Sequence, residues 1–201
     1  MKEPRCVDRD FEIPDFSDTD LKWLESYPIC EVDLGCARGH FLAGSAEKFT
    51  DRCFIGVEKS PVRVGKTQKK IDRLQLANAR VFQDENGHFL GENLPPESVD
   101  VLHILFPDPW PKRRHHIRRL IQPPFFGIAH RVVKVGGMLR FITDDYPYFE
   151  WASRFAKAQF GWESLTDFES EAEYPMTEFQ KKFTDRGLSI YSMWLRRRAV
   201  K

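Results

Sequence analysis

The chain has 201 residues, of which 41% are hydrophobic, and a formal net charge of only +1. This length predicts one compact domain with a buried core, while the composition excludes a low-complexity protein and a polycation that binds nucleic acid through its overall charge. The sequence contains no apolar run of membrane-spanning length, and its charged first ten residues do not resemble a secretory signal, so we expect a cytoplasmic protein. The four cysteines lack CxxC spacing, which favours buried thiols over zinc ligands or disulfides.

Short runs rich in β-formers alternate with longer amphipathic runs along the chain. The predicted strands are Ile29–Leu34, Cys53–Glu58, Ala79–Gln83, Val99–Phe106, Met138–Thr143, Trp162–Phe168 and Ser189–Arg197. The predicted helices are Phe41–Phe49, Val62–Leu76, Arg118–Val133 and Tyr148–Gln159, preceded by a cap or short helix over Glu12–Tyr27, and Glu169–Thr184 is expected to be irregular and exposed. This alternation predicts a parallel, doubly wound α/β sheet. We expect an N-terminal cap segment over residues 1–28 and a single domain over residues 29–201.

A glycine-rich turn follows the first predicted strand, at Gly35 and Gly39. Both glycines allow a close backbone approach to a ligand, although Ala37 stands where the dinucleotide fingerprint has a glycine. About twenty residues further on, the second strand ends in Glu58, the position suited to hold ribose hydroxyls. Together the turn and this acid favour a binding site for an adenosine-type cofactor over the alternative that Glu58 is an ordinary solvated acid at a strand end.

The choice of cofactor depends on Asp33, which directly precedes the turn. A pyrophosphate prefers a helix N-terminus with no carboxylate nearby, whereas a ligand with an amino group and a sulfonium suits one. This placement indicates S-adenosylmethionine rather than NAD. Glu85 and Asn86 follow the third strand, where the adenine edge would be bound, although an ordinary loop is an equal alternative.

The run from Phe106 to His116 follows the predicted strand Val99–Phe106 and contains three prolines in five residues. We expect a stiff, extended backbone there, which presents Asp108, Trp110 and then a block of cations at the carboxyl end of a strand, where ligands bind in open α/β sheets. The cations that could contact phosphates are Lys112, Arg113, Arg114, Arg118 and Arg119, with a solvated helix face as the alternative. His115 and His116 are adjacent and lack metal-ligand spacing, so no metal is expected. The pattern favours a site for a nucleobase attached to a nucleic acid.

These motifs resemble the bacterial tRNA (guanine-N7-)-methyltransferases over most of the chain, from Glu31 to Trp194. The most specific part is Phe106–Lys112, and two further motifs, Thr143–Tyr148 and Thr177–Gln180, occur in the same order. The resemblance implies a class I, Rossmann-like methyltransferase fold: a doubly wound, mostly parallel seven-stranded sheet with an antiparallel edge strand. It also implies methyl transfer from S-adenosylmethionine to guanine N7 at position 46 of the tRNA variable loop, leaving 7-methylguanine and S-adenosylhomocysteine.

The resemblance also implies residue roles. Asp33 and Glu58 hold the methionine and ribose ends of the cofactor beside Gly35, Glu85 helps to seat the adenosine, and Asp108 faces both the cofactor and the guanine. The residues implied to contact tRNA are Lys112, Asp144, Thr177, Glu178, Phe179 and Gln180. From the residues alone, Asp144 could equally cap the following helix, and Trp110 could stack on a base or pack against the prolines.

The sequence departs from the family pattern at three positions. Ala37 and Gln180 replace a usual glycine and glutamate, and Glu178 stands where a basic residue is common. These departures, with an acidic N-terminus, keep two alternatives open: a methyltransferase for another RNA or a small heteroaromatic, and a non-catalytic RNA-binding relative. A nicotinamide oxidoreductase is disfavoured by the glycine turn. We expect tRNA as partner, no membrane association, and a monomer or homodimer.

Overall fold

The computed structural model describes residues 15–158, 161–165 and 174–199. Its centre is a seven-stranded sheet with the order β3-β2-β1-β4-β5-β7-β6. The strands are β1 (Ile29–Leu34), β2 (Arg52–Val57), β3 (Ala79–Phe82), β4 (Val99–Leu105), β5 (Val133–Thr143), β6 (Trp162–Leu165) and β7 (Tyr191–Arg197). Strands β1 to β5 pair in parallel, and β7 lies antiparallel between β5 and the edge strand β6. The predicted class of fold, a mostly parallel α/β sheet with antiparallel pairing at one edge, is confirmed.

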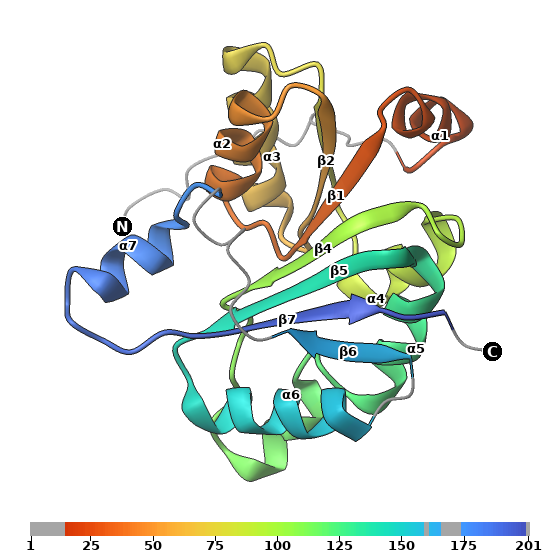
Figure 1. The fold of residues 1–201 in the computed structure, drawn as a ribbon. Coiled ribbons are helices and arrows are strands. Elements are labelled where there is room, and N and C mark those ends of the chain that lie inside the picture. Colours follow the sequence, from red (N-terminus) through yellow and green to blue (C-terminus); the bar gives the residue numbers. More distant parts are fainter. Residues whose placement is uncertain (1–14, 159–160, 166–173, 200–201) are drawn as a thin grey trace.

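Helices cover both faces of the sheet (Figure 1). The α-helices are α1 (Asp18–Glu25), α2 (His40–Lys48), α3 (Pro61–Leu74), α4 (Asn86–His88), α5 (Pro123–Val132), α6 (Tyr146–Ala158) and α7 (Glu178–Thr184), with a π-helical turn η1 (Phe89–Asn93) and a 3-10 turn η2 (Arg113–Arg118). Helices α2 and α3 pack on β2 and β3, whereas α5 and α6 pack on β5 from the other side. Helix α7 stands out beyond the strand ends, beside α2.

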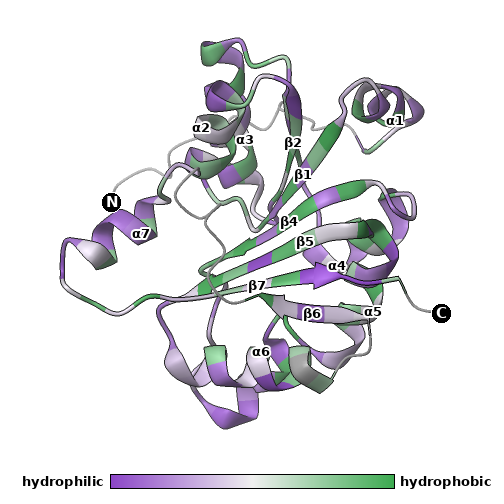
Figure 2. Cartoon of the chain, viewed as in Figure 1, coloured by the Kyte–Doolittle hydropathy of each residue, from purple (hydrophilic) through white to green (hydrophobic). Residues whose placement is uncertain are grey.

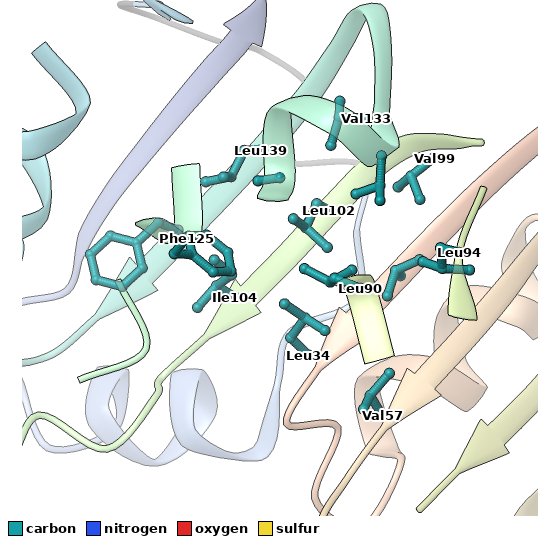
Figure 3. Packing of buried hydrophobic residues seen from close by; sticks show 14 of the residues in the cluster. Leu34, Val57, Leu90, Leu94, Val99, Leu102, Ile104, Phe125, Val133 and Leu139 are labelled. Carbon is teal, nitrogen blue, oxygen red and sulfur yellow. The ribbon is translucent and has the colours of Figure 1, made fainter. Parts of the chain in front are cut away.

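The larger hydrophobic core lies between the sheet and η1, α5 and α6, as Figure 3 shows for ten labelled side chains. Leu34, Leu102, Ile104 and Leu139 point to this face from three neighbouring strands and are almost fully buried, as is Leu90 of η1. Burying each such side chain contributes roughly 1.5–3 kcal/mol to folding. In Figure 2 hydrophobic colour accordingly appears along the central strands β1, β4 and β5, whereas β6 is paler and α7 is largely hydrophilic.

Two predicted elements were wrong in part. The predicted helix Arg118–Val133 is interrupted: η2 ends at Arg118, and α5 begins only at Pro123, because a proline is accommodated in the first turn of a helix but not in its interior. The segment Glu169–Thr184 is not irregular throughout, since α7 occupies its end. Thr177 caps α7 and Gln180 bonds back to Thr177, a reciprocal capping box. Residues 166–173 lie outside the described part of the chain.

The proline-rich segment after β4 is not simply extended. Phe106 and Trp110 both adopt positive φ angles, of 52° and 46°, so the backbone turns sharply on either side of Asp108. The Phe106 amide donates to the carbonyl of Ile142 at 2.8 Å, which fixes the start of this turn beside β5. Positive φ is costly for residues with a Cβ, and such positions are frequent near functional sites.

Candidate active site

A pocket of about 790 Å³ opens at the carboxyl ends of β1, β2 and β4. The sheet order changes direction between β1 and β4, the point at which doubly wound sheets bind ligands. The predicted site residues that line the pocket are Asp33, Gly35, Glu58, Glu85, Asn86, Asp108, Arg118, Thr177, Glu178 and Phe179. The structure therefore brings together residues from five separate places in the sequence.

The turn after β1 depends on positive φ angles at Gly35 (76°), Ala37 (52°) and Gly39 (64°). It is tied to β2, because the amides of Gly35 and Cys36 both donate to the carbonyl of Val57, at 2.8 and 3.0 Å. Ala37 adopts the left-handed conformation for which glycine is better suited. The turn therefore forms even though alanine replaces the usual glycine at this position.

Gly39 has no room for a side chain, because a Cβ there would lie 2.4 Å from Cγ2 of Thr67 on α3. We expect Gly39→Ala to lower the free energy of unfolding by about 2 kcal/mol or more through this clash and its positive φ. Gly65→Ala is the matched control, since a Cβ on Gly65 of α3 meets nothing within 4 Å and alanine favours a helix by about 0.5–1 kcal/mol. Denaturant unfolding measures both, and equal stability of the two variants would contradict the expectation.

Asp33 lies under the turn with only 4% of its surface exposed. It is part of a row across the sheet in which Asp33 pairs with His103, His103 with Arg140, and Arg140 with Trp194. Burial raises the pKa of Asp33 to about 7; Arg140 opposes this shift and Glu58 adds to it. A buried carboxyl group at this pKa is suited to receive a cationic ligand, which would favour its ionised form.

Arg140 is buried beneath the site, with 1% of its surface exposed. Its guanidinium lies 4.9 Å from the ring centre of Tyr174 and 5.4 Å from that of Trp194. Aromatic faces stabilise a desolvated cation. Arg140 therefore supplies a fixed positive charge on the same face of the sheet as Asp33.

The Glu58 carboxylate is buried and held by backbone amides. It accepts from the amide of Ala37 at 3.2 Å and from that of Ser60 at 2.9 Å, while Arg63 lies 3.6 Å away. These contacts fix the carboxylate between the turn after β1 and the start of α3. Glu85 and Asn86 lie at the start of α4 on the pocket wall, and the Asn86 side chain is close to Gly35.

Asp108 is exposed at the pocket mouth. The loop that carries it is held by Arg119, whose Nε donates to the carbonyl of Pro109 at 2.8 Å. Arg119 is 3% exposed, and its guanidinium lies over the rings of Tyr148 and Trp151. The prediction that Arg119 contacts phosphate is therefore wrong, because its side chain is enclosed by the protein and positions the Asp108 loop.

The other predicted phosphate ligands stay at the surface. Lys112, Arg113, Arg114 and Arg118 are exposed on or next to η2, and the Arg118 guanidinium lies 5.0 Å from the ring centre of Trp110. Trp110 also makes an edge contact with His115, so it packs against the basic turn while lining the pocket. Among these cations only Arg118 reaches the pocket wall.

Asp144 is exposed after β5 and is not among the residues that line the pocket. The cap of α6 comes from its neighbour, because Asp145 Oδ1 accepts from the amide of Tyr148 at 2.7 Å. The alternative in which Asp144 caps the helix is therefore wrong, and its side chain is available at the strand end.

The start of α7 forms one wall of the pocket. Phe179 and Phe183 pack against Phe106, with ring centres 5.9 and 5.6 Å from it, which joins α7 to the Asp108 loop. The Glu178 carboxylate lies 2.7 Å from Nε2 of His40 on α2, and its charge also acts favourably on Lys70 of α3. Gln180 lies outside the pocket and accepts from the amide of Thr177 at 3.3 Å.

Comparison with known proteins agrees with this arrangement. A family model described as "Putative methyltransferase" matches residues 28–193. The tRNA (guanine-N(7)-)-methyltransferase of Mycoplasma pneumoniae is 32% identical over 193 residues, covering 90% of this chain and 90% of that protein. The enzyme of the same name from Burkholderia ambifaria is 34% identical over 190 residues, covering 94% and 73%. The chain belongs to the tRNA (guanine-N(7)-)-methyltransferase family.

Solved structures agree with this family in fold. The 16S rRNA methyltransferase KamB matches with a TM-score of 0.67 at 18% identity, covering 94% of this chain and 97% of that one. The antibiotic-resistance methyltransferase Kmr matches with a TM-score of 0.63 at 18% identity, covering 94% and 96%. At this identity the likeness concerns the fold alone.

The charged or titratable residues of the site that the sequence did not predict include Arg38, His40, Lys59 and Arg63 on the pocket wall and Arg140 beneath it. A charged residue inside an otherwise apolar strand was the available signal for Arg140. Among the described residues, no group of His, Cys, Asp or Glu is arranged to hold a metal ion, and no helix has the length and apolarity to cross a membrane.

Proposed function

We propose that the protein transfers a methyl group from S-adenosylmethionine to N7 of a guanine in tRNA, at position 46 of the variable loop, giving 7-methylguanine. The observation that carries this proposal is the single pocket that joins Asp33, Glu58 and Asp108 at the switch point of the sheet. The names of the most similar relatives support guanine N7 and tRNA as the target.

The donor set of the pocket fits this cofactor. S-adenosylmethionine supplies an electrophilic methyl group on a sulfonium. Asp33 would bind its ammonium group, since a desolvated carboxyl group with a pKa of about 7 gains most from a cationic partner. Glu58, held by two amides, keeps lone pairs for ribose hydroxyls, and Glu85 and Asn86 would bind the adenine edge.

Guanine N7 carries a lone pair and no proton, so the protein needs no general base for the transfer. Its task is orientation of the ring and stabilisation of the positive charge that develops on it. Asp108 can accept hydrogen bonds from the N1–H and N2 amino groups of guanine and is held in place through the loop that Arg119 secures. We therefore assign Asp108 to positioning of the base and to charge stabilisation.

The exposed cations Lys112, Arg113, Arg114 and Arg118 would bind the RNA backbone beside the pocket. Asp144 and the start of α7, where Thr177, Glu178 and Phe179 line the pocket and Gln180 completes the cap, would complete the substrate site. Exposure of a stacked guanine costs a few kcal/mol, which these contacts would offset.

The function is tested by transfer of labelled methyl groups from S-adenosylmethionine into unmodified tRNA transcripts, followed by chain cleavage specific for 7-methylguanine. We expect cleavage at position 46 of the variable loop, and no label in a matched transcript with adenine 46. Label in ribosomal RNA or free guanosine, without label in tRNA, would contradict the proposal and favour another substrate. Cofactor binding without transfer to any RNA would favour a non-catalytic relative.

A further inference from the structure

The exposed face of α3 is cationic along its whole length. The helix carries five basic residues, Arg63, Lys66, Lys69, Lys70 and Arg73, and a single acid, Asp72. Val64, Thr67 and Ile71 form its buried face, and at 100° per residue Lys66, Lys69 and Arg73 lie on the opposite face while Arg63 and Lys70 lie along one flank. Apart from Arg63, which lies beside Glu58 on the pocket wall, these basic residues have no part in the function proposed above.

Solvation alone gives a poor account of this pattern. A solvated helix face is often stabilised by acids and bases at spacings of three and four residues. Here Lys66 has Lys69 and Lys70 at those spacings and Arg73 follows both, and the one acid, Asp72, stands at such a spacing only from Lys69. Like charges at these spacings destabilise a helix by a few tenths of a kcal/mol per pair. An anion bound to this face would offset that destabilisation of the helix.

This face begins at the rim of the active-site pocket. Lys59 and Arg63 line the pocket, and Lys70 Nζ donates to the carbonyl of Arg38, another lining residue, at 2.9 Å. From Arg63 to Arg73 the helix extends about 15 Å away from the rim. The basic face is therefore continuous with the site and long enough to follow several phosphates of one strand.

Cations from neighbouring elements add to it. The pKa of His40 is lowered by burial and also by the positive charges of Lys70, Arg38 and Lys181. These three come from α3, the turn after β1, and α7, so their fields converge at the pocket mouth. Glu178, whose carboxylate lies 2.7 Å from His40, opposes these charges in part, since it acts to raise the pKa of both His40 and Lys70.

We propose that α3, together with Arg38 and Lys181, forms a second binding surface for the backbone of the substrate RNA, across the pocket from Lys112–Arg118. Here this surface is called the α3 basic face. The inference rests on the proposed function, because the pocket between the two surfaces is taken to receive the guanine. RNA is the occupant that fits, since two separate cationic surfaces on opposite rims match one folded polyanion whose base enters between them.

The test compares three triple variants: Lys66→Ala, Lys69→Ala and Arg73→Ala on the α3 basic face; Lys112→Ala, Arg113→Ala and Arg118→Ala on the other rim; and Lys22→Ala, Lys48→Ala and Arg196→Ala towards the amino ends of the parallel strands, away from the pocket. All three remove the same charge. The α3 positions are exposed and helical, so alanine preserves the helix. Thermal unfolding and S-adenosylmethionine affinity verify that each variant is folded.

We expect the α3 variant to raise KM for tRNA about 10- to 50-fold, to leave kcat unchanged, and to reduce the slope of log affinity against log salt by about 2 to 3. The control variant, Lys22→Ala, Lys48→Ala and Arg196→Ala, should change neither. Unchanged tRNA affinity and salt slope in the α3 variant would overturn the inference, as would α3-dependent binding to anionic phospholipid vesicles without an effect on tRNA. If the wild-type protein binds tRNA through α3 but transfers no methyl group, the result supports this binding surface and contradicts the proposed function.

Discussion

Asp108→Ala is expected to lower kcat for methylation of tRNA by about 10³-fold while S-adenosylmethionine affinity stays within several-fold. The carboxylate lies at the pocket mouth between two backbone turns, at Phe106 and Trp110, and its loop is secured by Arg119. Its two oxygens can match the two donors on one edge of guanine, and its charge opposes the positive charge that the ring acquires. Both effects are greatest in the transition state, so the loss falls on kcat.

Asp108→Asn separates the two contributions. The amide keeps one acceptor but presents a donor to the second guanine donor and carries no charge, so we expect about a 10²-fold loss. Asp51→Ala, which removes an exposed carboxylate just before the amino end of β2, away from the pocket at the carboxyl ends of the strands, is the matched control. Single-turnover rates at saturating tRNA measure the effect, and a rate for Asp108→Ala equal to that of the control would remove Asp108 from the reaction.

Much of the site could be predicted because its residues lie in short contiguous motifs at the ends of predicted strands. Parallel strands place their carboxyl ends at one edge of the sheet, so acids at those ends, such as Asp33 and Glu58, are brought together by the fold class alone. The cation run after β4 is likewise a contiguous feature. Which of these cations are exposed and which are buried cannot be predicted in this way. Arg119 is enclosed by Tyr148 and Trp151 of α6, and no residue near Arg119 in the sequence indicates that contact.

The charged row beneath the pocket could not be predicted for the same reason. Asp33, His103 and Arg140 become neighbours only through the register of β1, β4 and β5. Helix α7 was missed because Thr177 and Gln180 form its capping box, whereas motif similarity draws attention to them as substrate ligands. A residue that matches a functional motif can also have a local structural role.

Asp33→Asn is expected to weaken S-adenosylmethionine binding on the order of 100-fold while stabilising the protein without cofactor. The folded-state pKa of Asp33, about 7, lies above the ordinary aspartate value of 3.8. The folded protein therefore keeps a proton that the unfolded chain releases, and stability falls as pH rises from about 4 to about 7. Asparagine removes this penalty, which is up to about 4 kcal/mol at pH 8 and less than half of that at pH 5. Thermal unfolding at both pH values measures the gain, and a variant less stable than wild type at pH 8 would contradict it.

The same carboxyl group should set the pH dependence of cofactor binding. Because only ionised Asp33 attracts an ammonium group, the affinity of the wild type should fall nearly tenfold for each pH unit below about 7. Arg140 of β5 and Glu58, just after β2, act on Asp33 but are present in both proteins, so Asp33→Asn should lose this slope. His40 also lines the pocket and titrates, with a pKa below its usual value. His40→Gln is therefore the control: loss of the slope in His40→Gln, with the slope retained in Asp33→Asn, would assign the dependence to the imidazole instead.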